Sequence, residues 1–260
     1  MSQLYVESGN LVAAAESAVR LEDLVCVRGG RRVLDSLSLA VADGGRVGIV
    51  GRSGVGKSTL LSLVAGLDDP DAGAVEVNGA TTAGERIAKC ALMPQRDCLL
   101  PWRTALDNST LALENAGISK THARALASPL FDRFGLAGCE RLRPAQLSGG
   151  MRQRIAFLRT LLTGKPVLLL DEPFGALDVI TRAELQVWLA EALAEEPRTV
   201  LLVTHDVEEA LLLCERVLVL REGRITLDLH VDVGAGLCRS EAVTHPGFLG
   251  LRQRALEAIG

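Results

Sequence analysis

The sequence predicts an α/β protein built on parallel strands that helices cover on both faces, with a helical subdomain inserted between the halves of the sheet. Continuous apolar runs at 166–170 and 200–203 are each followed by a polar turn and a helical segment, which is typical of buried parallel strands. A long segment with helical spacing (104–135) separates them from earlier strands. Aromatic residues are scarce (Phe 5, Trp 2, Tyr 1), so the core must consist mainly of Leu, Val and Ala.

The composition excludes several classes of protein. The 260 residues are 48% hydrophobic and 23% charged with a net charge of −4, as in a globular protein without the basic excess of a nucleic-acid binder. No apolar run approaches the roughly 18 residues of a membrane span. The start of the chain lacks a charged n-region and carries Glu16 in its most apolar stretch, which argues against a signal peptide. A role at a membrane would therefore require docking onto another protein.

The six cysteines include no CxxC pair, and several lie in apolar runs. We expect free, buried thiols in a reducing compartment rather than disulfides or a zinc site. They are residues 26, 90, 98, 139, 214 and 238.

The elements follow in order along the chain. Residues 1–20 have no strong period and are expected to form an N-terminal extension. Residues 21–230 form the main domain, with a helical subdomain at about 96–160, and residues 231–260 form a C-terminal tail with a helix. Strands are predicted at 21–27, 32–41, 46–50, 74–79, 88–94, 166–170, 200–203, 217–220 and 224–229, and helices at 57–67, within 104–135, and at 179–195, 207–214 and 246–258.

Residues 51–58 fit the phosphate-binding pattern GxxxxGK[ST], directly after a predicted strand and before a predicted helix. Glycines let the backbone turn its N–H groups toward phosphate oxygens, and the helix adds the positive end of its dipole. Lys57 can reach the outer phosphates, and the Ser58 hydroxyl suits a Mg²⁺ ligand. A chance match is expected about once in a hundred sequences. The nucleotide-binding residues predicted from this pattern are Gly51, Arg52, Ser53, Gly54, Val55, Gly56, Lys57 and Ser58.

The segment 167–172 is an apolar strand that ends in two carboxylates, Asp171 and Glu172. Ligands of open parallel sheets gather at such carboxyl ends of strands. Asp171 can hold Mg²⁺, directly or through water, and Glu172 can face an attacking water. Taken alone, such a pair is more often a solvated strand end, but the phosphate cradle reverses that preference. His205 ends the next apolar strand, and Asp206 with Glu209 predicts a capping box that holds it at the same edge, where it can bond a γ-phosphate.

A second anion-binding helix end is predicted at 147–154, LSGGMRQR. Ser148 is a good N-cap, and Gly149 and Gly150 expose backbone N–H groups. One nucleotide has one γ-phosphate, yet the chain carries two such surfaces. A head-to-tail dimer, in which each cradle meets the partner's helix end, resolves this.

These motifs, in this order, resemble the ATP-binding subunit of ABC transporters over about 21–230. Residues 51–59 resemble Walker A, which adds Thr59 to the nucleotide-binding residues, and Gln95 resembles the Q-loop. The signature is similar to 147–154, Walker B with its glutamate to 167–172, the D-loop to Gly175-Ala176-Leu177-Asp178, and the switch histidine to His205.

The resemblance implies a P-loop NTPase fold with a mostly parallel core sheet, an antiparallel β subdomain and the inserted helical subdomain. It implies an ATPase in which two copies enclose two ATP molecules, with Asp178 beside the nucleotide. Glu172, His205 and Gln95 are the implied catalytic residues, and Gln95 joins Ser58 and Asp171 around Mg²⁺ and relays to an integral-membrane permease. The subunit would lie peripherally on the cytoplasmic face of the inner membrane, indirectly served by a solute-binding protein.

The segment MPQRDCLLPWRTALDN (93–108) is similar to importers of the nitrate, sulfonate and taurine type and of the thiamine pyrimidine precursor. A soluble ABC-type ATPase in repair or translation is the alternative, but it would carry a long coiled coil or two cradles. A kinase with the same cradle would leave 147–154 unexplained. One departure concerns the base: the family's adenine-stacking aromatic is replaced by Arg28, which either stacks its guanidinium on adenine or leaves the base weakly held.

Overall fold

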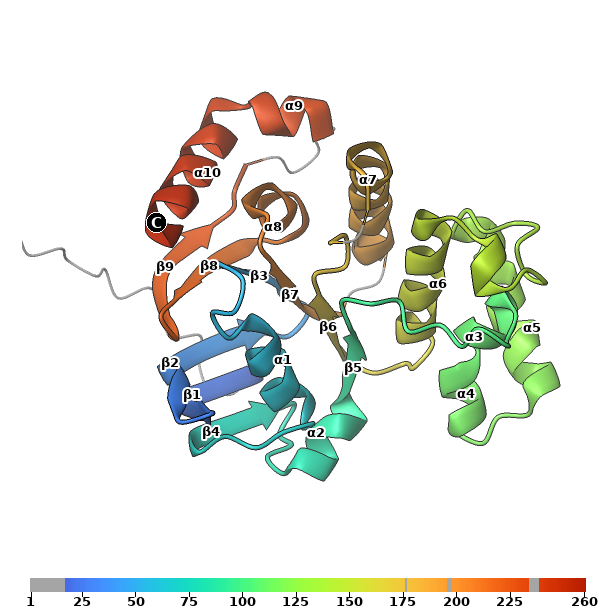
Figure 1. The fold of residues 1–260 in the computed structure, drawn as a ribbon, viewed down its shortest axis with the longest axis horizontal. Coiled ribbons are helices and arrows are strands. Elements are labelled where there is room, and N and C mark those ends of the chain that lie inside the picture. Colours follow the sequence, from blue (N-terminus) through green and yellow to red (C-terminus); the bar gives the residue numbers. More distant parts are fainter. Residues whose placement is uncertain (1–16, 176, 196–197, 234–238) are drawn as a thin grey trace, which may run out of the picture.

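The computed structural model describes residues 17–175, 177–195, 198–233 and 239–260. They form two sheets flanked by helices (Figure 1). The strands are β1 (Ser17–Arg28), β2 (Arg31–Ala42), β3 (Arg46–Val50), β4 (Ala72–Val77), β5 (Cys90–Met93), β6 (Val167–Asp171), β7 (Thr199–Thr204), β8 (Arg216–Arg221) and β9 (Arg224–His230). The helices are α1 (Lys57–Ala65), α2 (Ala83–Lys89), α3 (Ala105–Ser109), α4 (Leu111–Asn115), α5 (Lys120–Arg133), the short 3-10 turn η1 (Pro144–Gln146), α6 (Gly149–Leu161), α7 (Val179–Glu195), α8 (Val207–Leu213), α9 (Arg239–Thr244) and α10 (Pro246–Ile259).

The larger sheet has the strand order β5-β6-β7-β3-β8-β9, and all neighbours are parallel except the antiparallel pair β8 and β9. The smaller sheet is antiparallel, in the order β2-β1-β4. Because β3, β5, β6 and β7 run in the same direction, the segments that follow them meet at one edge. This edge receives the predicted cradle, the acidic pair, Gln95 and His205.

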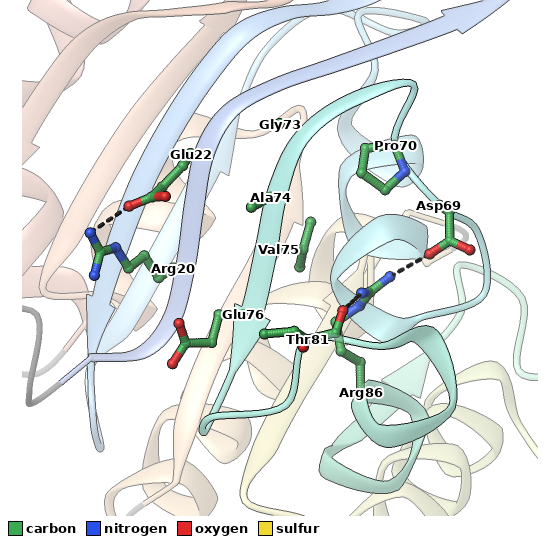
Figure 2. A pocket seen from close by; sticks show the side chains of 10 residues that line it. All are labelled: Arg20, Glu22, Asp69, Pro70, Gly73, Ala74, Val75, Glu76, Thr81 and Arg86. Atoms are coloured by element: carbon green, nitrogen blue, oxygen red, sulfur yellow. Dashed lines mark hydrogen bonds and ion pairs between the residues drawn. The ribbon is translucent and has the colours of Figure 1, made fainter.

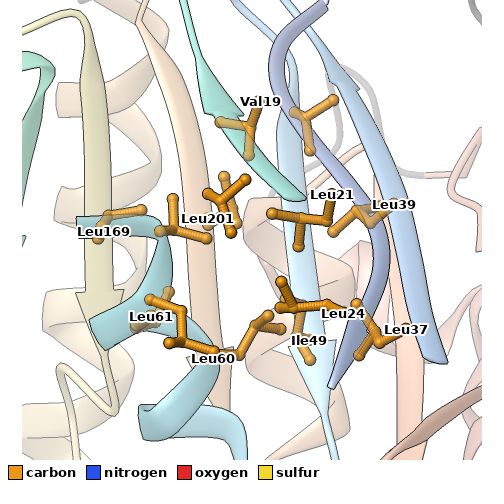
Figure 3. Packing of buried hydrophobic residues seen from close by; sticks show 14 of the residues in the cluster. Val19, Leu21, Leu24, Leu37, Leu39, Ile49, Leu60, Leu61, Leu169 and Leu201 are labelled. Atoms are coloured by element: carbon orange, nitrogen blue, oxygen red, sulfur yellow. The ribbon is translucent and has the colours of Figure 1, made fainter. Parts of the chain in front are cut away.

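Strand β6 separates two apolar clusters, because its side chains alternate between the two faces of the sheet. Leu169 belongs to the cluster that also contains Leu60 and Leu61 of α1 and residues of β1 and β2 (Figure 3). Leu168 and Leu170 belong instead to the cluster that contains the buried face of α6. Helices α1 and α6 therefore cover opposite faces of the sheet.

The helical subdomain lies beside β5 and comprises α3 to α6 (Figure 1, green to yellow). The segment predicted to be helical, 104–135, contains the three helices α3, α4 and α5, and Gly117 has a left-handed φ of 86° in the turn before α5. Arg124 of α5 donates to both carboxylate oxygens of the buried Asp107 on α3, at 2.7 and 3.0 Å. This ion pair ties the five-residue helix α3 to the longer α5.

The C-terminal helix α10 packs on the domain rather than extending away from it. Phe248 and Ala255 are buried against α8 and the adjoining strands. Gly48 lets α8 approach the sheet closely, since a Cβ there would lie 2.9 Å from the Cβ of Ala210. In the described ranges, no helix is both long and apolar enough to cross a bilayer.

The structure differs from the sequence prediction at several points. Strand β1 begins at Ser17, before the predicted boundary at 21, and residues 1–16 of the predicted extension lie outside the described residues. Helix α2, which Thr82 begins with a capping box, was not predicted. Cys98 is exposed, so the expectation that all cysteines are buried is wrong for it, whereas the other four described thiols are buried and free. Cys238 lies outside the described residues.

Candidate nucleotide-binding and hydrolysis site

The phosphate cradle connects β3 to α1 as its motif predicts. Gly56 is the N-cap of α1 with a left-handed φ of 112°, which favours glycine. A Cβ at Gly51 would lie 2.4 Å from the backbone oxygen of Leu220, so this position has no room for a side chain. A Cβ at Gly56 would lie 2.9 Å from Cγ1 of Val33, which shows that β2 packs against the loop. Residues 52–54 are exposed at its rim.

The ammonium group of Lys57 lies inside this loop. Its Nζ donates to the carbonyl oxygens of Gly51 at 2.8 Å and Arg52 at 3.0 Å, and the side chain is 5% exposed. Oε1 of Glu172 lies 3.8 Å away. Burial lowers the pKa of Lys57, and the nearby Glu172 and Asp171 carboxylates oppose that shift. The lysine is therefore a buried cation held among oxygen atoms.

Ser58 and Asp171 meet across the edge of the sheet. The Ser58 hydroxyl donates to Oδ1 of Asp171 at 3.1 Å. Burial raises the pKa of Asp171, while the Ser58 hydrogen bond and Lys57 lower it. Hydroxyl and carboxylate oxygens are the donors that Mg²⁺ prefers, so this pair fits a magnesium ion that the nucleotide phosphates complete. Within the described ranges, no group of three or more His, Cys, Asp or Glu residues could hold a metal on its own.

Glu172 lies at the centre of the site. Its φ is +44°, a conformation uncommon for a side-chain-bearing residue, and its N–H donates to the Val203 oxygen of β7 at 2.8 Å. Oε2 accepts from Nε2 of Gln95 at 3.1 Å and lies 3.3 Å from Nδ1 of His205. The structure thus brings together the three residues predicted as catalytic, which are 77 and 33 positions apart from Glu172 in the chain.

The signature segment begins α6 as predicted, and Oγ of Ser148 accepts from the N–H of Met151 at 3.2 Å. A Cβ at Gly149 would lie 3.1 Å from Cδ2 of Leu177, and one at Gly150 would lie 2.9 Å from Cγ2 of Thr181. The glycines therefore allow α6 to pack against the start of α7. This helix end and the cradle of the same chain are on different sides of the sheet, because α1 and α6 cover opposite faces of it.

The predicted D-loop runs from Glu172 to α7. A Cβ at Gly175 would lie 3.4 Å from Oε2 of Glu172, which places this loop over the central carboxylate. Asp178 accepts from the N–H groups of Ile180 and Thr181 at 3.1 and 3.0 Å, so it begins α7. Ala176 lies outside the described residues. A cleft of about 460 Å³ lies between the Q-loop and the start of α6, with Gln95, Gly149, Gly175 and Leu177 in its lining.

A second hollow, of about 400 Å³, lies in the antiparallel subdomain between β1, β4 and the loop before α2 (Figure 2). The buried Arg86 guanidinium donates to the Thr81 oxygen and pairs with Asp69 at 3.0 Å. At the other end Arg20 pairs with Glu22. Both arginines thus pair with carboxylates of the subdomain itself, although the buried Nε of Arg86 has no hydrogen-bond partner among the described residues. The hollow shares no lining residue with the cradle.

The structure corrects one prediction beside His205. Asp206 caps α8 by accepting from the N–H groups of Glu208 and Glu209, at 2.8 and 3.4 Å. The Glu209 carboxylate does not complete the predicted capping box. It is buried and accepts from the Thr204 hydroxyl at 2.5 Å, and that hydroxyl accepts from the Asp206 N–H at 3.0 Å. Sequence reasoning missed Thr204 because a threonine that ends a buried strand carries no motif.

Arg28, which replaces the expected aromatic residue, is held by carboxylates. Its guanidinium pairs with Asp68, and Nη1 lies 3.9 Å from Asp71. Asp71 also accepts from the Val27 N–H at 2.7 Å. Arg28 is therefore tethered to the loop that follows α1 rather than free to adopt any orientation.

Comparisons with known proteins identify the family of this chain. Residues 34–175 match the family described as "ABC transporter". The chain is 52% identical over 199 residues to the aliphatic sulfonates import ATP-binding protein SsuB 1 of Rhodococcus jostii, covering 76% of this chain and 77% of that protein. It is 47% identical over 187 residues to the formylaminopyrimidine import ATP-binding protein ThiZ of Halalkalibacterium halodurans, covering 72% of each.

A solved structure shares both fold and sequence. The dimeric ATP-binding cassette MJ0796, bound to ADP and Pi in a post-hydrolysis state, superposes with a TM-score of 0.73 at 30% identity, over 82% of this chain and 98% of that one. The family match spans more than half of the 260 residues, and it includes the cradle and the acidic pair. The chain therefore belongs to the ABC transporter family, as one of its ATP-hydrolysing subunits.

Proposed function

We propose that this chain drives an importer of a small organic solute, in a head-to-tail dimer docked on an integral-membrane permease at the cytoplasmic face of the inner membrane. The observation that carries the proposal is the position of the signature helix end, on the opposite face of the sheet from the cradle of its own chain. A second copy is needed to bring a signature to each nucleotide.

Nucleotide binding begins at Lys57. Its ammonium group exchanges the carbonyl oxygens of Gly51 and Arg52 for the outer phosphates, whose negative charge compensates the burial of the cation. The N–H groups of the loop and of the first turn of α1 bind the remaining phosphate oxygens. Ser58 and Asp171, with Gln95 nearby, would hold Mg²⁺, which when bound neutralises charge on the phosphate oxygens.

Hydrolysis is assigned to the cluster around Glu172. Its carboxylate orients the attacking water and accepts a proton from it, and the nearby His205 binds the γ-phosphate oxygens. Gln95 contacts Glu172 directly and lies at the start of the segment that leads to the helical subdomain. A change in nucleotide state at Glu172 would therefore move Gln95, and the helical subdomain would transmit this movement to the permease. In the dimer, Ser148, Gly149, Gly150 and Asp178 face the nucleotide held by the second copy.

The names of two relatives support a proposal for the solute class. SsuB 1 and ThiZ are named as importers of aliphatic sulfonates and of formylaminopyrimidine. We propose a solute of this group, which a separate solute-binding protein delivers to the permease. Purification of the tagged chain from membranes, followed by identification of its partners and ligand screening on the binding protein, tests this. Recovery of the chain without any polytopic partner favours the alternative, an ABC-type ATPase not coupled to transport.

Mixing two inactive variants tests the shared site directly. Lys57→Ala removes the cradle cation, and Ser148→Arg blocks the signature of the other site. In a mixed dimer both defects fall in one composite site and the second site is intact, so activity should return on mixing. If each chain forms a complete site by itself, mixing restores nothing. Each variant mixed with itself is the control.

A further inference from the structure

Glu209 is a buried carboxylate that the hydrolysis scheme does not use. It lies on α8, is 2% exposed, and accepts from the Thr204 hydroxyl at 2.5 Å. The same hydroxyl accepts from the Asp206 N–H at 3.0 Å. Thr204 and Asp206 are the two neighbours of His205 in the chain. The backbone on both sides of the histidine is therefore attached, through one hydroxyl, to the Glu209 carboxylate.

Arg182 of α7 reaches the same carboxylate from the other direction. Its Nη2 donates to the Leu177 oxygen of the D-loop at 3.2 Å. Its Nε lies 4.0 Å from Oε1 of Glu209, and Nη1 lies 4.0 Å from Oδ2 of Asp206. One guanidinium thus lies between the D-loop and the two carboxylates that hold the histidine loop.

The contact between Arg182 and Glu209 is incomplete in this structure. Nε of Arg182 is buried and has no hydrogen-bond partner among the described residues, although it faces an oxygen of Glu209 at 4.0 Å. A charge-assisted hydrogen bond would require an approach of roughly 1 Å, and a buried donor without an acceptor favours that approach. Burial raises the pKa of Glu209, and Asp206 also raises it, while Thr204, Arg182 and His205 lower it.

We propose that Arg182 and Glu209 are positioning residues that link the D-loop to the switch histidine. When the second copy engages the D-loop at Leu177, Arg182 moves onto Glu209 and Asp206, and the attached histidine loop shifts His205 relative to Glu172. Hydrolysis at each site would thereby depend on contact between the D-loop and the second copy. This inference rests on the proposed roles of His205 and of the dimer.

Kinetics of single and double variants test the link. Arg182→Met and Glu209→Gln should each lower kcat about 10- to 100-fold, since misplacing a catalytic group by about 1 Å has effects of this size. KM for ATP should change less than about twofold, because neither residue contacts the cradle. The double variant should be no slower than the slower single variant. Arg182→Lys keeps the charge and should recover part of kcat.

Arg252→Met is the matched control. Arg252 also pairs with a glutamate of α8, since its Nε lies 2.9 Å from Oε1 of Glu208, but it comes from α10 and not from the D-loop side. Its kcat should stay within about twofold of wild type. Thermal unfolding of every variant separates lost folding from lost positioning. If Arg182→Met does not fold, the comparison of Glu209→Gln with Arg182→Lys carries the test.

His205→Ala distinguishes the two levels of failure. If it retains turnover, the proposed role of the histidine is wrong, and the proposed coupling of Arg182 and Glu209 to His205 is overturned with it. If it abolishes turnover while Arg182→Met and Glu209→Gln keep kcat within about twofold of wild type, only the link is overturned. Additive losses in the double variant would equally overturn it, because independent effects are not a shared path.

Discussion

Replacing Glu172 by Gln removes the charge that faces the attacking water and leaves the shape of the side chain. Loss of a general base lowers rates by about 10²–10⁴, which corresponds to roughly 2.7–5.4 kcal/mol of barrier at about 1.36 kcal/mol per decade. ATP binding should persist or tighten. The lost carboxylate lies 3.8 Å from Nζ of Lys57 and would stand near the phosphates. Two like charges about 4 Å apart repel by about 4 kcal/mol at an effective dielectric constant of about 20.

Phosphate release under saturating ATP measures kcat, and binding of a fluorescent ATP analogue measures affinity. Size-exclusion chromatography with light scattering should show a Glu172→Gln dimer that persists in ATP, because the nucleotide is not consumed. Glu222→Gln is the matched control, since it makes the same chemical change at a side chain that is 85% exposed. A Glu172→Gln protein with turnover within about threefold of wild type would refute the assignment of this carboxylate as base.

Three further predictions concern the cradle, the helical subdomain and the base. Gly51→Ala should abolish nucleotide binding in calorimetry, because its Cβ would lie 2.4 Å from the backbone oxygen of Leu220 and one of the two segments must shift; unchanged affinity would contradict the close approach. Arg124→Met should destabilise the protein by about 1 kcal/mol at pH 7 in urea unfolding. The Arg124 hydrogen bonds hold the pKa of Asp107 below its ordinary range, so this contribution is present above the unfolded pKa and lost as pH falls, and the difference from wild type should shrink toward about pH 3; a difference independent of pH would contradict it. With Arg28 tethered by carboxylates in place of an aromatic platform, GTP hydrolysis should be comparable to ATP hydrolysis in a phosphate-release assay; a preference for ATP above about tenfold would show that adenine is recognised by other means.

Local sequence determined the elements that carry the chemistry. The glycines at 51 and 56, the lysine between loop and helix, and the apolar run that ends in Asp171 each specify a local conformation with few alternatives, because steric limits and strand burial act within about ten residues. The parallel direction of β3, β6 and β7 then follows from their alternation with helices. For this reason the sequence alone predicts that the cradle, the acidic pair and His205 lie at one edge of the sheet.

Contacts between distant segments were decided only by tertiary structure. The hydrogen bond from Gln95 to Glu172, the packing of Gly150 against Thr181 and the buried pair of Thr204 and Glu209 join segments whose spacing or residue types give no local signal. Glu209 shows the reason most clearly. Its position three residues after Asp206 favours a capping box, but burial of α8 against the sheet leaves its carboxylate no water, so it takes the nearest buried hydroxyl instead. The partner of the Glu209 carboxylate is thus determined by desolvation in the assembled fold. A local stretch of sequence does not show how deeply a residue will be buried.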